Sequence, residues 1–436
     1  MKKTIRKYTH STQVYSVGFL VVALFAGAYF FIPQVAPLSY SSENVLATPQ
    51  DIEVVEHEAR YTSAHLETPS AVKAIYMTQC VVGTPSFRDS LVELVEETEV
   101  NSIIIDIKDF TGSLVFRSEH PLLKDNGGKG CRARDIREFI ETLHNKGIYV
   151  IGRITVFQDP YYTKVHPELA VRSTLSSTTP WTDHKGLPFI DVSSRPFWDY
   201  IVAISKESYA LGFDELNYDY IRYPSDGPMK EAVFINNNKA EALEGFFKYL
   251  HEQVHPTGAK MSADLFGYTA ILTDDLGIGQ QLERALPYFD FIAPMVYPSH
   301  YNKGFAGLSN PNTDPHKVVF TSMAAAVART RAEETTVKAF NGEEIFINKV
   351  TPAYYNENNE FIATSTHQVS SGKYTKPIYD AQKLRPWLQD FDYGGDYDIA
   401  EVRAQIQATY DAGLTSWMLW SPSNRYTRGA LESAQE

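Results

Sequence analysis

The chain has 436 residues, of which 43% are hydrophobic, and its formal net charge is -13. The length suits one large α/β barrel with additions, and the acidic balance excludes a nucleic-acid partner, because binding a phosphate backbone needs a basic face. The aromatic content of 13% suits a sugar-binding surface, since the C–H faces of sugars stack on rings, although many rings belong to a core of this size.

The first 33 residues predict a membrane anchor. Four basic residues open the segment: Lys2, Lys3, Arg6 and Lys7. The uncharged run that follows is most apolar over residues 17–32. This run is close to the roughly 20 residues that span a bilayer and long for a signal-peptide core of about 7–15. We therefore expect a single-pass protein of the cell membrane, with its basic flank in the cytoplasm and its C-terminal domain outside.

Two alternatives to an anchor stay open. Cleavage after Val45-Leu46-Ala47 would release a secreted protein, and an apolar run can also form a buried helix of a soluble protein. Residues 34–71 are polar, contain proline and show no clear period, which is typical of a linker. A short tail is expected over residues 426–436.

The chain contains two cysteines, Cys80 and Cys131. In an exported chain such a pair forms either a disulfide or two buried thiols, and spacing does not decide between them. The sequence contains no CxxC, no HExxH and no histidine cluster. We therefore expect neither a metal site nor a cofactor.

Short β-branched runs alternate with amphipathic helical patterns over residues 72–425. The eight runs are 73–80, 100–109, 148–157, 213–220, 260–267, 289–298, 384–393 and 414–422. Seven helical patterns lie between them: 86–98, 132–147, 195–212, 239–255, 278–288, 315–333 and 400–413. Eight alternations predict a (β/α)8 TIM barrel. The alternative, an open doubly wound sheet, usually begins with a glycine-rich turn, but TQCVVGTPS follows the first strand here.

Residues 335–376 interrupt this alternation with polar, Tyr- and Thr-rich sequence, which predicts a small β-rich insertion or lid.

Polar and aromatic residues gather where the predicted strands end. In a (β/α)8 barrel these ends carry the active site. The candidates, in chain order, are Asp106, Lys108, Arg153, Asn217, Asp219, Arg222, Asp264, Tyr297, His300, Trp387, Gln389 and Trp420.

Strand parity selects two acids from this set. Leu216 and Tyr218 share one face of the fourth strand, so Asn217 and Asp219 point to the barrel axis. By the same reasoning Asp264 points inward from the fifth strand. A pair of acids flanking a scissile bond is what glycoside hydrolysis requires.

Structural roles compete with several of these assignments. Asp219 and Arg222 are close enough in sequence to form an ion pair that only orders the loop. Glu215 is expected to be a deeper barrel contact, and Asp214 a structural residue that faces the helices. Lys108 and Arg153 are expected either to bind sugar hydroxyls or to neutralise the acids. Each tryptophan, Trp417 included, fits a core position as well as a sugar platform.

Five ordered motifs carry a resemblance to a known family. They are FDELNYDYIRYP, SADLFG, APMVYPSHY, LRPWLQDFDYG and SWMLWSPSNRYT. Over residues 72–425 the chain resembles the bacterial family called the "putative glycosyl hydrolase domain", related to barrel glycosidases such as the alpha-amylase superfamily. The resemblance implies that Asp219 is the nucleophile and Asp264 the general acid. Amylases carry Glu where this chain has Asp264, on the fifth strand. Tyr297, on the sixth strand, is the alternative residue to assist the reaction.

The sequence therefore predicts a glycoside hydrolase acting on cell-envelope or extracellular polysaccharide. In this prediction Arg153, Lys108, Tyr297 and Gln389 hold the sugar. The alternative is a catalytically inactive barrel that binds carbohydrate or organises the envelope. A third possibility, a metal-dependent deacetylase, lacks the His/Asp ligand cluster that it would need.

Overall fold

The computed structural model describes residues 64–126 and 131–434. The predicted anchor and most of the predicted linker lie outside the described residues. Within the described ranges, no helix combines the length and the apolar character needed to cross a bilayer.

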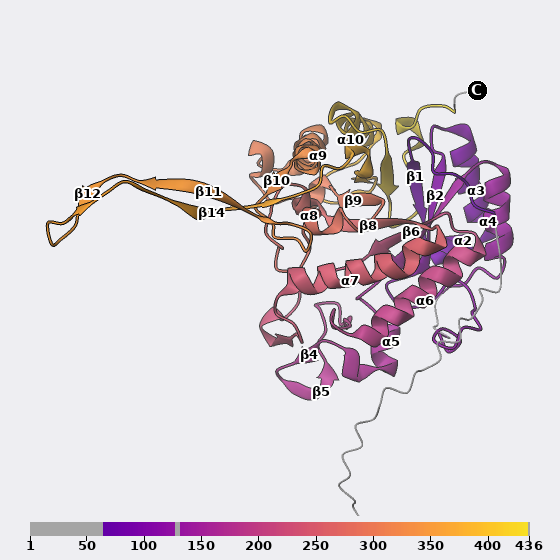
Figure 1. Cartoon of the computed structure of the whole chain (residues 1–436). Coiled ribbons are helices and arrows are strands. Elements are labelled where there is room, and N and C mark those ends of the chain that lie inside the picture. Colours follow the sequence, from indigo (N-terminus) through magenta and orange to yellow (C-terminus); the bar gives the residue numbers. More distant parts are fainter. Residues whose placement is uncertain (1–63, 127–130, 435–436) are drawn as a thin grey trace, which may run out of the picture. The chain divides into compact units, whose positions relative to one another are not determined.

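The described residues form a closed barrel of eight parallel strands surrounded by helices (Figure 1). The barrel strands are β1 (Lys73–Met77), β2 (Ser102–Lys108), β3 (Tyr149–Thr155), β6 (Glu215–Asp219), β8 (Lys260–Phe266), β9 (Phe291–Met295), β15 (Trp387–Gln389) and β16 (Trp417–Trp420). Pairing of β16 with β1 closes the barrel. The predicted (β/α)8 TIM barrel is confirmed, and the open doubly wound sheet is wrong, because an open sheet would leave two unpaired edges.

Helices follow seven of the strands. They are α2 (Gln79–Val82), α3 (Pro85–Glu97), α4 (Ile136–Asn145), α5 (Pro160–Val165), α6 (Arg195–Leu211), α7 (Lys239–Val254), α8 (Leu282–Ala285), α9 (Pro315–Arg331) and α10 (Ile399–Asp411). Helix α8 is much shorter than the pattern over 278–288 predicts. The reason is that Gly279 has a φ of 85°, and the buried Gln280 side chain turns inward to bond the backbone of Ile221, Asp264 and Phe266.

Alternate side chains of the barrel strands enter two different apolar clusters. Leu216, Tyr218 and Met261 belong to the large cluster between strands and helices, whereas Tyr76 and Trp387 belong to a smaller cluster inside the barrel. The predicted strand parity is therefore confirmed for the fourth and fifth strands. Trp417 lies in the outer cluster and is a core residue.

The N-terminal end of the barrel is sealed by buried polar contacts. Arg385 donates from Nη1 to both carboxylate oxygens of Glu215, at 2.9 and 3.1 Å. Asp214 accepts hydrogen bonds from Leu66 N at 2.8 Å and Val150 N at 2.8 Å, and its Oδ2 lies 3.0 Å from a ring nitrogen of His144 on α4. Both acids therefore have the structural positions that their parity predicts.

The segment around the predicted insertion forms a long antiparallel ribbon, here called the arm (residues 344–375). Its strands are β11 (Glu344–Thr351), β12 (Tyr354–Tyr355), β13 (Phe361–Ile362) and β14 (Ser365–Thr375). At its base β14 also pairs with β10 (Glu334–Thr335). Figure 1 shows the arm extending away from the barrel, with β12 near its tip.

Two further features complete the fold. The loop predicted after the third strand contains β4 (Arg172–Ser173) and β5 (Ser176–Pro180), which form a small sheet with β7 (Ala232–Val233). Cys80 on α2 and Cys131 form a disulfide with a sequence separation of 51 residues. This bond decides between the two states that the sequence leaves open.

Candidate functional site

A cavity of about 330 Å³ opens at the C-terminal ends of the barrel strands. Its lining combines two acids and two arginines with many aromatic rings. The residues are Arg153, Asp219, Tyr220, Arg222, Asp264, Phe266, Gly267, Tyr268, Met295, Tyr297, His300, Tyr301, Trp387 and Trp420. The position is the one where (β/α)8 enzymes carry their active sites.

Asp219 ends β6 and is held through both of its carboxylate oxygens. Its Oδ1 accepts from Tyr220 N at 2.6 Å, and its Oδ2 accepts from Arg153 through Nε at 3.2 Å and also through Nη2. Tyr220 has a φ of 51°, in the left-handed region that non-glycine residues rarely adopt. Such conformations cluster at functional sites, where the surrounding structure enforces them.

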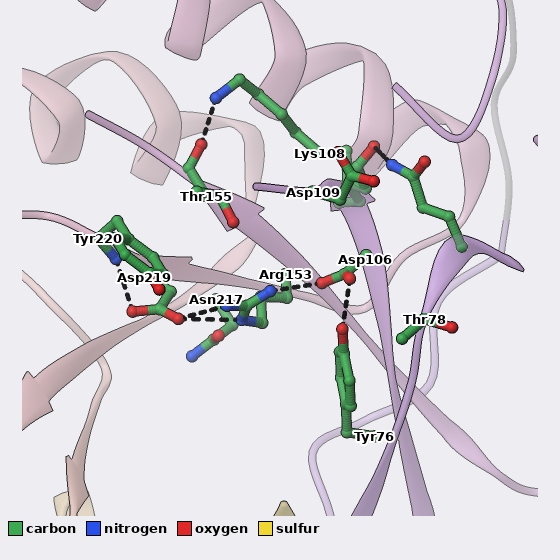
Figure 2. A network of polar contacts seen from close by, with 12 residues as sticks. Tyr76, Thr78, Asp106, Lys108, Asp109, Arg153, Thr155, Asn217, Asp219 and Tyr220 are labelled. Carbon is green, nitrogen blue, oxygen red and sulfur yellow. Dashed lines mark hydrogen bonds and ion pairs between the residues drawn. The ribbon is translucent and has the colours of Figure 1, made fainter. Parts of the chain in front are cut away.

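Arg153 lies between two carboxylates (Figure 2). Its Nη1 donates to Asp106 Oδ1 at 2.6 Å, and the second oxygen of Asp106 accepts from the Tyr76 hydroxyl at 2.5 Å. Burial raises the pKa of Asp106 to about 6, although Arg153 and Tyr76 act in the opposite direction. Burial alone would lower the pKa of Arg153, but the charges of Asp219 and Asp106 outweigh it and raise that pKa. Arg153 therefore stays cationic and orients Asp219.

Asp264 lies beside Asp219 on the neighbouring strand, in a different environment. β6 and β8 pair with Asn217 opposite Ser262 and Tyr218 opposite Ala263, so the next positions along the two strands are the two acids. Asp264 Oδ1 accepts from Asn217 Nδ2 and from Trp387 Nε1, both at 2.8 Å. Its Oδ2 has no hydrogen-bond partner among the described residues.

Burial, and after it the charge of Asp219, raises the pKa of Asp264 well above its usual range. Since Oδ1 already accepts two hydrogen bonds, Oδ2 is the oxygen open to a proton. The site thus contains two neighbouring acids in contrasting environments, because one is bound by a cation and burial favours the neutral form of the other.

Aromatic side chains form much of the cavity wall. The Trp420 ring stacks on Tyr76 at a centroid distance of 4.2 Å and meets Trp387 edge-on at 5.6 Å. Tyr297 and His300 come from the end of β9 and the turn after it, and burial lowers the pKa of His300. Rings of this kind suit the C–H faces of a sugar.

The chain was compared with known proteins. A family model described as "Putative glycosyl hydrolase domain" matches residues 74–342 and 345–426. The chain belongs to this family. A search of the curated proteins finds no match.

Solved structures resemble this glycosyl hydrolase domain to different degrees. A hypothetical protein from Ruminiclostridium thermocellum ATCC 27405 is 32% identical, with 47% of this chain and 98% of that one covered and a TM-score of 0.40. The PgaB (BpsB) glycoside hydrolase domain from Bordetella bronchiseptica is 13% identical over 83% and 99% of the two chains, with a TM-score of 0.51. A chitinase from Chromobacterium violaceum ATCC 12472 is 12% identical over 83% and 97%, with a TM-score of 0.42. The Bordetella structure supports the barrel fold alone.

Most of the residues that the sequence proposes for the site of this glycosyl hydrolase domain line the cavity, but four do not. Lys108 is fully buried and bonds the carbonyl oxygens of Thr155 and Val156 together with the carboxylate of Asp159 at 2.9 Å. Figure 2 shows its ammonium group pointing away from Arg153. Lys108 thus has its own buried partners, and we leave it out of the proposed site.

The other three lie outside the cavity lining and make hydrogen bonds to residues in the lining or next to it. Asp106 holds Arg153, and Asn217 holds Asp264. Gln389 Oε1 accepts hydrogen bonds from the backbone N–H of Ser299 at 3.2 Å and from the hydroxyl of Ser299 at 2.7 Å. These bonds fix the turn that carries His300. All three act as positioning residues.

Arg222 lines the cavity but does not pair with Asp219. Among the described residues its guanidinium makes one hydrogen bond, from Nη1 to Tyr223 O at 3.0 Å, and no ion pair. The loop-ordering ion pair that the sequence allows is therefore not formed, because Arg153 and Tyr220 N occupy the oxygens of Asp219.

Sequence reasoning missed several members of the site. Tyr76 is the most important of them, since it holds Asp106 and stacks on Trp420. The alternation in KAIYM places Tyr76 on the inner face of β1, so the parity argument applied to the first strand would have found it. The rings of Tyr268 and Tyr301 come from loops, where parity gives no guidance.

In the part of the chain that the structure describes, no group of three or more His, Cys, Asp or Glu side chains is arranged to hold a metal ion.

Proposed function

We propose that this domain is a glycoside hydrolase that cleaves polysaccharide of the cell envelope or the surroundings with Asp219 and Asp264. The observation that carries the proposal is the contrast between two neighbouring inward acids. Arg153 contacts only one of them, while burial favours the protonated form of the other. Glycosidases need this contrast between a charged and a protonated carboxyl group.

In the proposed reaction Asp264 acts as the general acid. Its proton passes from Oδ2 to the glycosidic oxygen as the bond from that oxygen to the sugar carbon breaks. Asp219 stabilises the positive charge that develops on this carbon, either by attack or by its charge alone. Water supplies the hydroxyl group of the new sugar end, and its released proton restores the acid.

The test uses Asp219→Asn and Asp264→Asn variants, assayed for new reducing ends on a panel of peptidoglycan and polysaccharide fragments. Each variant should keep a cooperative unfolding transition and the far-UV circular dichroism of a folded barrel and lose activity by about 10²–10⁴-fold. Asp226→Asn is the matched control, because Asp226 is exposed on the loop after β6 and outside the cavity lining. Full activity in both site variants would overturn the proposal.

A second candidate, glycan binding without turnover, is favoured by one observation. Protein donors already occupy both oxygens of Asp219, which leaves it less free to attack a sugar. A binding protein of this kind would bind members of the same panel and release no reducing ends. Its Asp219→Asn variant would bind them as tightly as the wild type does. Loss of turnover in that variant excludes it.

We also propose that the domain works outside the cytoplasm. The Cys80–Cys131 disulfide supports this, because disulfides persist in oxidising compartments. Attachment to the membrane through residues 17–32 is the proposed mode, and release as a secreted protein is its alternative. Membrane fractions washed without detergent retain an anchored protein and lose a cleaved one, and the N-terminal residue of the recovered chain identifies any cleavage.

A further inference from the structure

Arg222 has a different environment from the other buried arginines of the described chain. Three arginines are buried: Arg153, Arg222 and Arg385. Arg153 pairs with Asp106 and Asp219, and Arg385 pairs with Glu215. Among the described residues, only Arg222 of these three has no carboxylate within ion-pair distance.

The Arg222 guanidinium is held between aromatic rings at the cavity wall. Its Cζ lies 4.9 Å from the centroid of Tyr220 and 4.8 Å from that of Phe266. These rings fix the position of the cation and offer it some electrostatic compensation, but they supply no in-plane hydrogen-bond acceptor. Apart from the bond to Tyr223 O, the guanidinium donors have no acceptor in the described part of the chain.

Burying a cation without a partner is unfavourable. Burial lowers the pKa of Arg222, and the neighbouring Tyr220 and Asp219 offset this only in part. Asp219 does not act as the missing partner, since its oxygens accept from Arg153 and Tyr220 N. Arg222 lines the same cavity as both acids.

We propose that Arg222 binds a carboxylate on the substrate, so that the cleaved polysaccharide is acidic and carries carboxyl-bearing sugars next to the scissile bond. A planar carboxylate matches the guanidinium fork and takes two parallel hydrogen bonds from it. Since Arg222 lines the same cavity as Asp219 and Asp264, the bound carboxylate lies on the sugar at the cleavage point or on its neighbour. This inference rests on the proposed function, because it names the substrate class of the same cavity.

The experiment measures binding by calorimetry at low salt and does not depend on turnover. The probes are short oligosaccharides of galacturonate, of glucuronate and of N-acetylmuramate, each paired with its own uncharged methyl ester. Wild-type protein should bind at least one acid about ten-fold tighter than its ester. Arg222→Gln should bind acid and ester alike, and Arg222→Lys should keep an intermediate preference, because lysine keeps the charge without the fork.

Arg195→Gln is the matched control, since Arg195 is exposed and also lies over two rings, those of Trp198 and Tyr249, away from the cavity. It should keep the full preference. Equal binding of acid and ester by wild-type protein for all three sugars would overturn the inference, and so would a preference that survives in Arg222→Gln. Hydrolysis of the acidic glycan by Arg222→Gln at the wild-type rate would reject the inference while leaving the proposed hydrolase intact. A preference for acid that depends on Arg222, without any hydrolysis, would reject the proposed hydrolase and leave the carboxylate site intact.

Discussion

Burial of Asp264 favours the protonated form that the proposed reaction needs, and it opposes folding above the pKa of a free aspartate. Burial raises the pKa of this carboxyl group, so the folded protein holds the proton up to a higher pH than the unfolded chain does. The unfolded chain releases that proton above about pH 4. Between pH 4 and the raised pKa the unfolded state therefore binds fewer protons than the folded state, and the stability contributed by Asp264 falls as the pH rises.

We predict that Asp264→Asn stabilises the protein at pH 7 while abolishing activity. The asparagine keeps an Oδ1 acceptor for Asn217 and Trp387 and has no proton to take up on folding. The free energy of unfolding should rise by about 1 kcal/mol or more, as is common when a functional residue is replaced by one that suits the fold. Differential scanning calorimetry at pH 7 and pH 4 measures this.

At pH 4 the difference between variant and wild type should largely vanish, because the carboxyl group is then protonated in most unfolded chains as well. A variant that unfolds at a lower temperature than wild type at pH 7 would contradict the argument. Asp226→Asn should show no such pH dependence.

The contacts of Asp219 show how far reasoning from sequence reaches at this scale. Alternation along each of two strands was enough to place Asp219 and Asp264 on the inner face. The sequence offers two arginines as partners of Asp219, Arg222 nearby in the chain and Arg153 on β3, and alternation does not decide between them. Which arginine meets the acid depends on the register that sets Thr155 opposite Asp219. Single-sequence patterns carry no information on that register.

At the scale of elements, the disulfide joins two peripheral segments of the barrel. Cys80 lies on α2 and Cys131 precedes α4, and the bond closes a loop that contains β2. Cross-linking stabilises a fold mainly by restricting the unfolded chain, and a loop of this length corresponds to about 4 kcal/mol in the chain-entropy treatment.

We predict that the Cys80→Ser/Cys131→Ser double variant loses about 2–4 kcal/mol of unfolding free energy relative to the oxidised protein. Urea denaturation of both proteins, with and without dithiothreitol, measures the difference. Reductant should lower the midpoint of the wild type and leave the double variant unchanged. An unchanged wild-type midpoint under reduction would show that the bond adds nothing to stability.

The arm illustrates which property of an element the sequence predicts. Its Tyr- and Thr-rich alternation indicates β structure, and the structure has strands there. Its projection from the barrel could not be predicted, because both faces of the ribbon mix apolar and polar side chains. Phe346, Asn348 and Val350 share one face, and Ile347 and Lys349 the other. Because neither face of the ribbon is uniformly apolar, its sequence does not indicate whether the ribbon packs on the barrel or extends from it.

We predict that removal of the arm leaves the barrel intact. Glu344 and Tyr374 face each other at its base, so an Asn-Gly turn can replace residues 345–373. The side chains lost are mostly exposed, and the free energy of unfolding should change by no more than about 0.5 kcal/mol. Thermal unfolding and the reducing-end assay check this, and a large loss of stability would mean that the arm contributes to the barrel core.

At the scale of the whole described domain, the proposed active site and the buried ion pair that stabilises the barrel lie at opposite ends of its axis. The cavity with Asp219 and Asp264 occupies the C-terminal ends of the strands. The N-terminal ends contain the buried pair of Glu215 and Arg385 and the contacts of Asp214 with Leu66. β1 pairs with β16 from Lys73 opposite Trp417 to Ile75 opposite Leu419 and closes the barrel, so the two ends belong to one cooperative structure.

This separation leads to opposite expectations for substitutions at the two ends. Arg385 is 1% exposed and Glu215 0%, so Arg385→Met leaves a buried carboxylate without its cation. Breaking a buried pair in this way costs about 3–5 kcal/mol, whereas replacing both partners by apolar residues is often neutral.

We predict that Arg385→Met lowers the unfolding free energy by this amount and that Glu215→Leu/Arg385→Met restores most of it. Both variants should keep the wild-type kcat below their unfolding temperatures. Chemical denaturation and the reducing-end assay provide the two readouts, and Asp264→Asn provides the opposite pattern of higher stability without activity. Loss of kcat in a folded Arg385→Met protein would show instead that the two ends of the barrel are coupled.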